Sequence, residues 1–83
     1  MDKYYLLTGF YASSIISALQ ALKELKPVLY KISECASREE NENIKYFISV
    51  NFPANGVALE ELYEEKRAQI EKVCKKHYGL FVN

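Results

Sequence analysis

Tryptophan is absent from this sequence of 83 residues, histidine occurs once and cysteine twice. Cys35 and Cys74 are far apart in the chain and form no C-x-x-C pair, so the disulfide scaffold of a small secreted protein is excluded. Two thiols and one imidazole are also too few for an ordinary zinc site. The three glycines form no phosphate-binding loop. We therefore expect a reduced, cytoplasmic protein that holds no metal and no cofactor.

An excess of charge of either sign is also missing, because 11 Lys and Arg residues balance 11 Asp and Glu residues. A neutral chain lacks the general attraction for phosphate that drives DNA binding. The longest stretch without charge, residues 4–22, contains Thr8, Gly9 and several serines, and its first half alternates as a strand does. We expect neither DNA binding nor a membrane span.

The length limits the architecture to a single domain, residues 1–83. A chain this short buries only about 60% of its unfolded surface, which leaves room for one sheet and one layer of helices. The apolar periodicity predicts a strand, a helix, two strands and a helix: 4–11, 15–26, 28–34, 44–52 and 57–77. Residues 80–82 are long enough for a short closing strand, so the order β-α-β-β-α with or without a final strand stays open. Right-handed crossovers would place both helices on one face of an antiparallel sheet. We predict an α+β fold with the ferredoxin-like split βαβ arrangement.

Several local features of these elements are predicted as well. The first strand is apolar at both parities, as in a strand buried on two sides, and Gly9 marks a bulge or a turn out of the strand. Ser13 or Ser14 caps the first helix, and Pro27 ends it. The apolar stripes predicted for the two helices are Ile15, Ala18, Leu19, Leu22 and Leu25, and Leu59, Leu62, Tyr63, Ile70, Val73 and Cys74.

The face of the sheet turned away from the helices is the most informative surface. If the even-numbered residues of the second and third strands face the helices, the odd-numbered ones form a mixed surface on the other side. The first strand adds either its odd or its even residues to that surface, and its sequence leaves the choice open. Such a patch is larger than a soluble monomer ordinarily exposes, unless the C-terminal segment folds over it. The candidate partner-binding residues are Tyr5, Leu7, Leu29, Lys31, Lys45 and Phe47.

These features favour a small protein-interaction module that is not an enzyme. Seven tyrosines support this interpretation, since Tyr combines apolar area with a polar tip and is enriched at protein interfaces. We expect a protein partner, either a second copy in a homodimer or a larger protein that the module modulates. The acidic first half and basic second half of the second helix suit antiparallel pairing of two copies, although the same order also stabilises a single helix.

A single-stranded RNA-binding domain is the alternative function. RNA-recognition domains carry the pattern Lys/Arg-Gly-aromatic-Gly/Ala-Phe-Val-x-aromatic in their third strand. Residues 45–52 agree with this pattern at Lys45, Phe47, Val50 and Phe52 and disagree at Tyr46, Ile48 and Ser49. Tyr5 of the first strand would supply a second stacking ring. The neutral charge disfavours this alternative, because it offers little attraction for phosphate.

A small enzyme built on Cys74 and His77 is the third hypothesis. Their spacing places both side chains on neighbouring ridges of the second helix, with Glu71 one turn earlier. A nucleophilic cysteine needs a lowered pKa, and the C-terminal end of a helix favours the opposite shift. We therefore expect a buried thiol and a half-exposed imidazole without a catalytic role.

Overall fold

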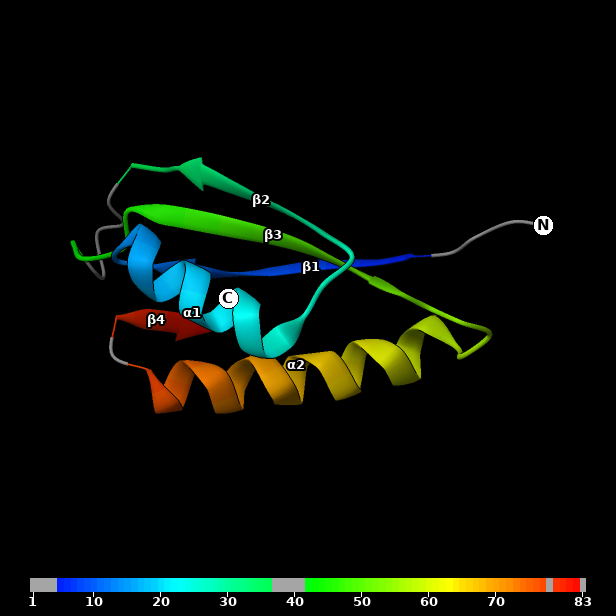
Figure 1. Ribbon diagram of the computed structural model, residues 1–83. Helices are drawn as coiled ribbons and strands as arrows, with labels where there is room; N and C mark the ends of the chain where they lie inside the picture. Colours follow the sequence, from blue (N-terminus) through cyan, green and yellow to red (C-terminus); the bar gives the residue numbers. More distant parts are fainter. Residues whose placement is uncertain (1–4, 37–41, 78, 83) are drawn as a thin grey trace.

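The computed structural model describes residues 5–36, 42–77 and 79–82. Its elements follow the order β-α-β-β-α-β: β1 (Tyr5–Ala12), α1 (Ile15–Leu25), β2 (Leu29–Glu34), β3 (Tyr46–Pro53), α2 (Leu59–Lys76) and β4 (Leu80–Val82). Neighbouring strands are antiparallel, and their order across the sheet is β2-β3-β1-β4 (Figure 1). This arrangement confirms the predicted α+β, ferredoxin-like fold.

β1 runs through the middle of the sheet, and its two faces differ: the even-numbered side packs on the helices, whereas Tyr5 and Leu7 on the other side are exposed and only Gly9 there is buried. Leu6, Phe10 and Ala12 are buried, whereas Tyr5 and Leu7 are exposed. The prediction that this strand is buried on both sides is wrong, because α1 and α2 cover the same face and no other described segment covers the opposite one (Figure 1). The even-numbered residues of β1 therefore belong to the core.

The core lies between this face of the sheet and the two helices. β3 alternates as predicted, with buried residues at the even positions: Ile48, Val50 and Phe52. Tyr46 and Ile32 are partly buried at the border of the core, on the same side. Phe10 and Phe52 are the largest side chains that the core encloses fully.

The ends of α1 agree with the sequence. The Ser14 hydroxyl accepts a hydrogen bond from the backbone N–H of Ser17 at 3.1 Å, and a cap of this kind contributes about 1 kcal/mol. Lys26 closes the helix with a left-handed φ of 51°, and Pro27 follows it. α2 begins without a side-chain cap, and acidic residues in its first turn and lysines in its last turn favour the helix dipole instead.

α1 packs on the sheet through small residues. Its buried side consists of Ala18, Ala21, Leu22 and Leu25. The predicted stripe is wrong at Ile15 and Leu19, which are exposed. Because Ala18 and Ala21 are small, the side of the helix that carries them approaches the sheet closely, and the larger residues lie at the border.

α2 is covered over only part of its length. The residues that it buries are Leu62, Ile70 and Cys74. Leu59 and Tyr63 are exposed, contrary to the predicted stripe. β4 has only three residues and pairs with Phe10–Ala12 of β1, so the sheet ends at β1 beside the first half of α2. Arg67 of α2 donates a hydrogen bond to the carbonyl of Gly9 at this uncovered edge, at 3.0 Å.

Gly9 lies in a regular part of the sheet. It pairs with Ser49 of β3 in an unbroken register, so the predicted bulge or turn is wrong. A Cβ atom at this position would come within 2.5 Å of both the Ile48 carbonyl oxygen and the Cζ atom of Phe47. The glycine is required because the neighbouring backbone and an aromatic ring approach β1 closely.

Candidate protein-interaction face

We call the face of the sheet opposite the helices the open face. It consists of odd-numbered residues of three strands: Tyr5, Leu7, Gly9, Tyr11, Leu29, Lys31, Ser33, Phe47, Ser49, Asn51 and Pro53. The register arranges nine of them in three rows across β2, β3 and β1: Leu29, Asn51 and Leu7; Lys31, Ser49 and Gly9; Ser33, Phe47 and Tyr11. Five of the six predicted contact residues lie on this face, and Lys45 precedes β3 at the same parity.

Leu7 and Leu29 are the most exposed apolar side chains of the open face, at 65% and 63%. They flank Asn51 in one row, so their Cα atoms are about 10 Å apart across β3. Tyr5, 46% exposed, is the next residue of β1 on the same face. Large apolar side chains gathered in this way are typical of a contact surface, whereas single scattered ones are ordinary.

Phe47 is half-buried, because its ring packs against neighbouring residues of the open face. Its ring lies beside that of Tyr11, with centroids 5.1 Å apart and planes at 53°. It also covers Gly9 of the neighbouring strand, an arrangement that stabilises a sheet. The candidate contact residue Phe47 is therefore only partly accessible, because its ring also packs against the sheet itself.

The structure does not bring Tyr5 and Phe47 together as a stacking platform. Tyr5 pairs with Pro53, whereas Phe47 pairs with Tyr11, which lies about 20 Å further along β1. The aromatic pair of the open face is thus Tyr11 with Phe47. Tyr11 is one of the odd-numbered residues that the sequence offers for this face, but its pairing with Phe47 depends on the register between segments distant in the sequence.

Lys31 on the open face and Lys45 beside it, just before β3, give this side of the sheet a positive character. Both residues are exposed. Lys31 lies in the middle row beside Ser49, and Lys45 lies at the end of the sheet where its carbonyl accepts a hydrogen bond from the Cys35 N–H at 2.9 Å. No Asp or Glu belongs to the open face as defined, so the face favours negatively charged groups on whatever contacts it.

The C-terminal strand does not cover the open face. β4 lies along the edge of β1, with Phe81 opposite Tyr11 and Val82 opposite Phe10. Of the residues that the structure describes, none lies over Leu7 or Leu29, which keep most of their surface accessible. The apolar row therefore remains available for contact.

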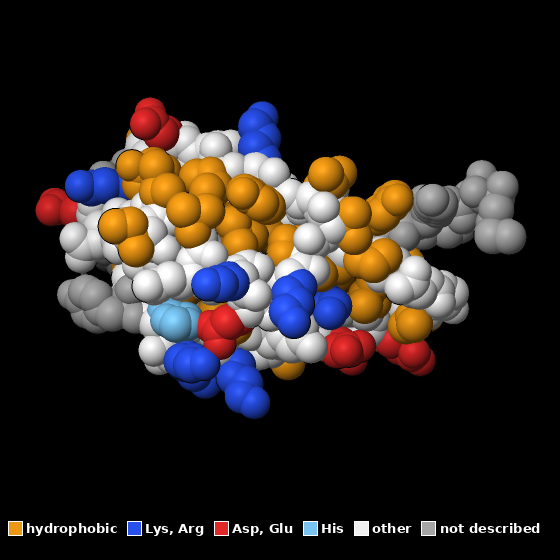
Figure 2. All heavy atoms as spheres, viewed as in Figure 1, with side chains coloured by type: hydrophobic (Ala, Val, Ile, Leu, Met, Phe, Trp, Pro, Cys, Tyr) orange, Lys and Arg blue, Asp and Glu red, His pale blue; other side chains and the backbone are white. Residues whose placement is uncertain are grey.

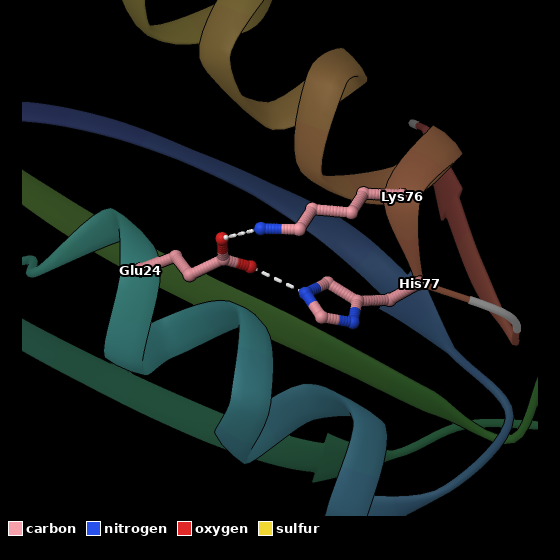
Figure 3. A network of polar contacts seen from close by, with 3 residues as sticks. All are labelled: Glu24, Lys76 and His77. Carbon is pink, nitrogen blue, oxygen red and sulfur yellow. Dashed lines mark hydrogen bonds and ion pairs between the residues drawn. The ribbon is translucent and has the colours of Figure 1, made fainter.

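Cys74 and His77 make separate contacts. Cys74 is buried, and burial raises the pKa of its thiol to about 11, so the thiol is protonated at neutral pH and is a poor nucleophile. The His77 Nε2 atom contacts the carboxylate of Glu24 on α1, and Lys76 donates to the other carboxylate oxygen at 2.8 Å (Figure 3). The hydrogen bond from Lys76 contributes most to lowering the pKa of the Glu24 carboxyl, and the bond with His77 lowers it further. They tie the end of α2 to α1.

The two cysteines are expected to react with iodoacetamide at very different rates. Cys35 is partly exposed, whereas Cys74 is buried and its thiol has a pKa of about 11. At neutral pH the native protein should therefore gain a label at Cys35, and Cys74 should be labelled only in denaturant, as peptide mass spectrometry would show. Rapid labelling of Cys74 in the native protein would instead support the enzyme hypothesis.

Within residues 5–36, 42–77 and 79–82, no three His, Cys, Asp or Glu side chains are placed to hold a metal ion. Neither helix in this part of the chain combines the length and the apolar character needed to cross a membrane. Comparison with known protein families, with curated proteins and with solved structures finds no match for this chain. The open face is therefore the feature of this chain that bears most directly on its function.

Proposed function

We propose that this chain is a small, non-catalytic protein-interaction module that binds a partner protein through the open face. The observation that carries the proposal is the exposure of Leu7 and Leu29 in one row beside Tyr5. Full burial of a leucine side chain contributes about 1.5–3 kcal/mol, so two leucines and a tyrosine supply the apolar centre of an interface. By occupying an apolar surface of a larger protein, the module would modulate that protein.

Charge selects the kind of partner. Lys31 and Lys45 are not offset by any acidic residue of the open face. Two open faces packed against each other would bring the lysines of both copies into one interface, and like charges at an interface disfavour association. A different protein, with an apolar centre and Asp or Glu side chains around it, suits both features of the face.

Leu7→Glu and Leu29→Glu are each expected to abolish binding of this partner while the chain stays folded, because both side chains are exposed. Tagged wild-type protein and each variant are incubated with extract of the source cells, and the recovered proteins are quantified by mass spectrometry. Val57→Glu, at an exposed site outside the open face, is the matched control.

The protein enriched by the wild type should fall at least about tenfold with either face variant, and it should be unchanged with Val57→Glu. Equal recovery by the wild type and both face variants would exclude the open face as the binding surface.

Single-stranded RNA binding is the second candidate, favoured by the ring pair of Tyr11 and Phe47 next to the row of Lys31. We expect no micromolar binding of mixed-sequence oligonucleotides at physiological salt, because Phe47 is half-buried and the chain is neutral. Fluorescence anisotropy over a salt titration measures this. Micromolar binding that weakens steeply with salt, and that Lys31→Ala reduces, would overturn the protein-partner proposal.

A further inference from the structure

The outer edge of β2 is unpaired in the described chain. β2 ends the sheet order, with β3 on its inner side. The Cys35 N–H donates to the Lys45 carbonyl, and an antiparallel ladder alternates, so the odd-numbered residues of β2 bond to β3 while the even-numbered ones point their N–H and C=O groups outward. These outward residues are Tyr30, Ile32 and Glu34. Within β2 there is neither a proline nor a bulge, two common means of blocking such an edge. Of its charged residues, Lys31 has its side chain on the open face and Glu34 lies at the end of the strand, so Tyr30 and Ile32 form an uncharged middle of the edge on the helix side.

An apolar strip continues from this edge on the helix side of the sheet. Tyr30 is 54% exposed there, although it has the parity of the core residues. α1 adds two exposed residues, Ile15 and Leu19. They lie on the side of α1 away from α2, because Glu24 on the opposite side of the helix bonds to α2, and α2 packs over β1 and β4. Ile16 is also exposed, but it lies opposite the buried side of α1 and points away from the sheet. Figure 2 shows hydrophobic side chains gathered across α1 and the neighbouring strands.

We propose that β2 of a second copy of this chain pairs antiparallel with β2, across a twofold axis perpendicular to the sheet. Outward N–H and C=O groups in a row are satisfied by an extended strand, and the twofold pairing supplies one with matching geometry. The two sheets become one continuous sheet. This inference concerns the edge strand and does not rest on the function proposed for the open face.

The sequence of β2 favours one register for this pairing. Outward-pointing residues must pair with each other, and one such register places Ile32 on the axis, opposite its own copy. Tyr30 then lies opposite Glu34, and Lys31 lies opposite Ser33. Sliding the strands by two residues in one direction places Lys31 opposite its own copy, and like charges directly opposite destabilise a strand pair. Sliding in the other direction places Ile32 opposite Glu34 and loses the apolar contact.

The paired strands alone are too small an interface, so the proposed dimer also uses the apolar strip. A specific interface takes about 800 Å² from each partner, which exceeds what a strand of six residues buries. Because the axis is perpendicular to the sheet, both copies carry their helices on the same side, and their apolar strips meet over the paired strands. The open faces of both copies remain free on the opposite side, so self-association and partner binding are compatible.

The oligomeric state of two matched variants tests this pairing. Leu19→Glu and Leu7→Glu introduce the same charge at exposed leucines, 46% and 65%, on opposite sides of the sheet. In sedimentation equilibrium at micromolar concentration, we expect dimers for the wild type and Leu7→Glu, and a dissociation constant at least about tenfold higher for Leu19→Glu. A monomeric wild type would overturn the inference. So would dissociation by Leu7→Glu with an intact Leu19→Glu dimer, which would assign self-association to the open face.

Tyr30→Pro and hydrogen exchange test the strand contact itself. The Tyr30 N–H points outward, so proline removes no bond to β3 and the fold should persist by circular dichroism, while the dimer should be lost.

In the wild type, the amides of Tyr30, Ile32 and Glu34 should exchange more slowly as protein concentration rises. Exchange independent of concentration would contradict the pairing. Partner recovery should persist with Tyr30→Pro, which separates this inference from the proposed function.

Discussion

Replacing Phe10 with alanine is expected to lower the free energy of unfolding by about 3–5 kcal/mol. Phe10 is fully buried in the middle of β1, opposite Ile48 of β3 and Val82 of β4. Removing its ring leaves a cavity where the sheet meets the helices, and the neighbouring residues fill such a cavity only in part. Since a small domain is stable by only about 5–15 kcal/mol in total, the variant should lose much of its resistance to urea.

Urea titration followed by circular dichroism measures this effect. Leu7→Ala is the matched control, because Leu7 lies on the same strand with its side chain exposed, and its loss should be below about 1 kcal/mol. Where Phe10→Ala fails to fold, Phe10→Leu, with an expected loss of about 1 kcal/mol, replaces it. Equal losses at positions 10 and 7 would contradict the assignment of the even-numbered residues of β1 to the core.

Gly9→Ala is expected to destabilise the protein by about 1–3 kcal/mol, although it adds only one methyl group. The new Cβ atom would lie 2.5 Å from the Ile48 carbonyl oxygen, which belongs to the backbone of β3. Relief therefore requires β1 and β3 to shift relative to each other. The ring of Phe47 lies equally close, but a side chain moves more easily than a backbone.

The double variant Gly9→Ala with Phe47→Ala separates the two contacts. If the ring were the main obstacle, removing it would make Gly9→Ala neutral. Because the Ile48 carbonyl remains, we expect the cost of Gly9→Ala in the Phe47→Ala background to fall only in part. Ser49→Ala, at the residue opposite Gly9, should cost less than about 0.5 kcal/mol in the same urea titrations. A Gly9→Ala variant as stable as the wild type would refute the close approach.

The order of strands and helices could be predicted because each element is specified by its own residues. β3 alternates buried and exposed positions, as a half-buried strand does. Ser14 and Pro27 mark the limits of α1, and Gly79, with its positive φ of 89°, precedes β4. Six elements in this order, with right-handed connections, allow few arrangements other than the observed one.

Packing, in contrast, depends on which segments meet. β1 is apolar on both sides, so only the placement of both helices on one face decides that Leu7 is exposed and Phe10 is buried. Hydropathy ranks Ile15 above Ala18, yet the small side chain of Ala18 is the one that fits against the sheet. These outcomes follow from tertiary shape, which a periodicity along one segment does not contain.

The candidate site was predicted in part. The alternation in β2 and β3 correctly places Leu29 and Phe47 on the face away from the helices. The contact between Phe47 and Tyr11 depends on the register between β1 and β3, and the half-buried state of Phe47 depends on Gly9 beneath its ring. The binding role of the open face itself stays a prediction.

Site-specific photocross-linking tests most directly whether a protein partner contacts the open face. A photoreactive benzoylphenylalanine replaces Leu29 on the open face or, as the control, the exposed Ala68 on α2, and each protein is irradiated in extract of the source cells. We predict a discrete protein adduct from position 29 alone, resistant to ribonuclease and suppressed by excess wild-type protein but not by excess Leu7→Glu. Equal adducts from both positions, no adduct at all, or an adduct that ribonuclease removes would contradict binding of a protein partner at this face.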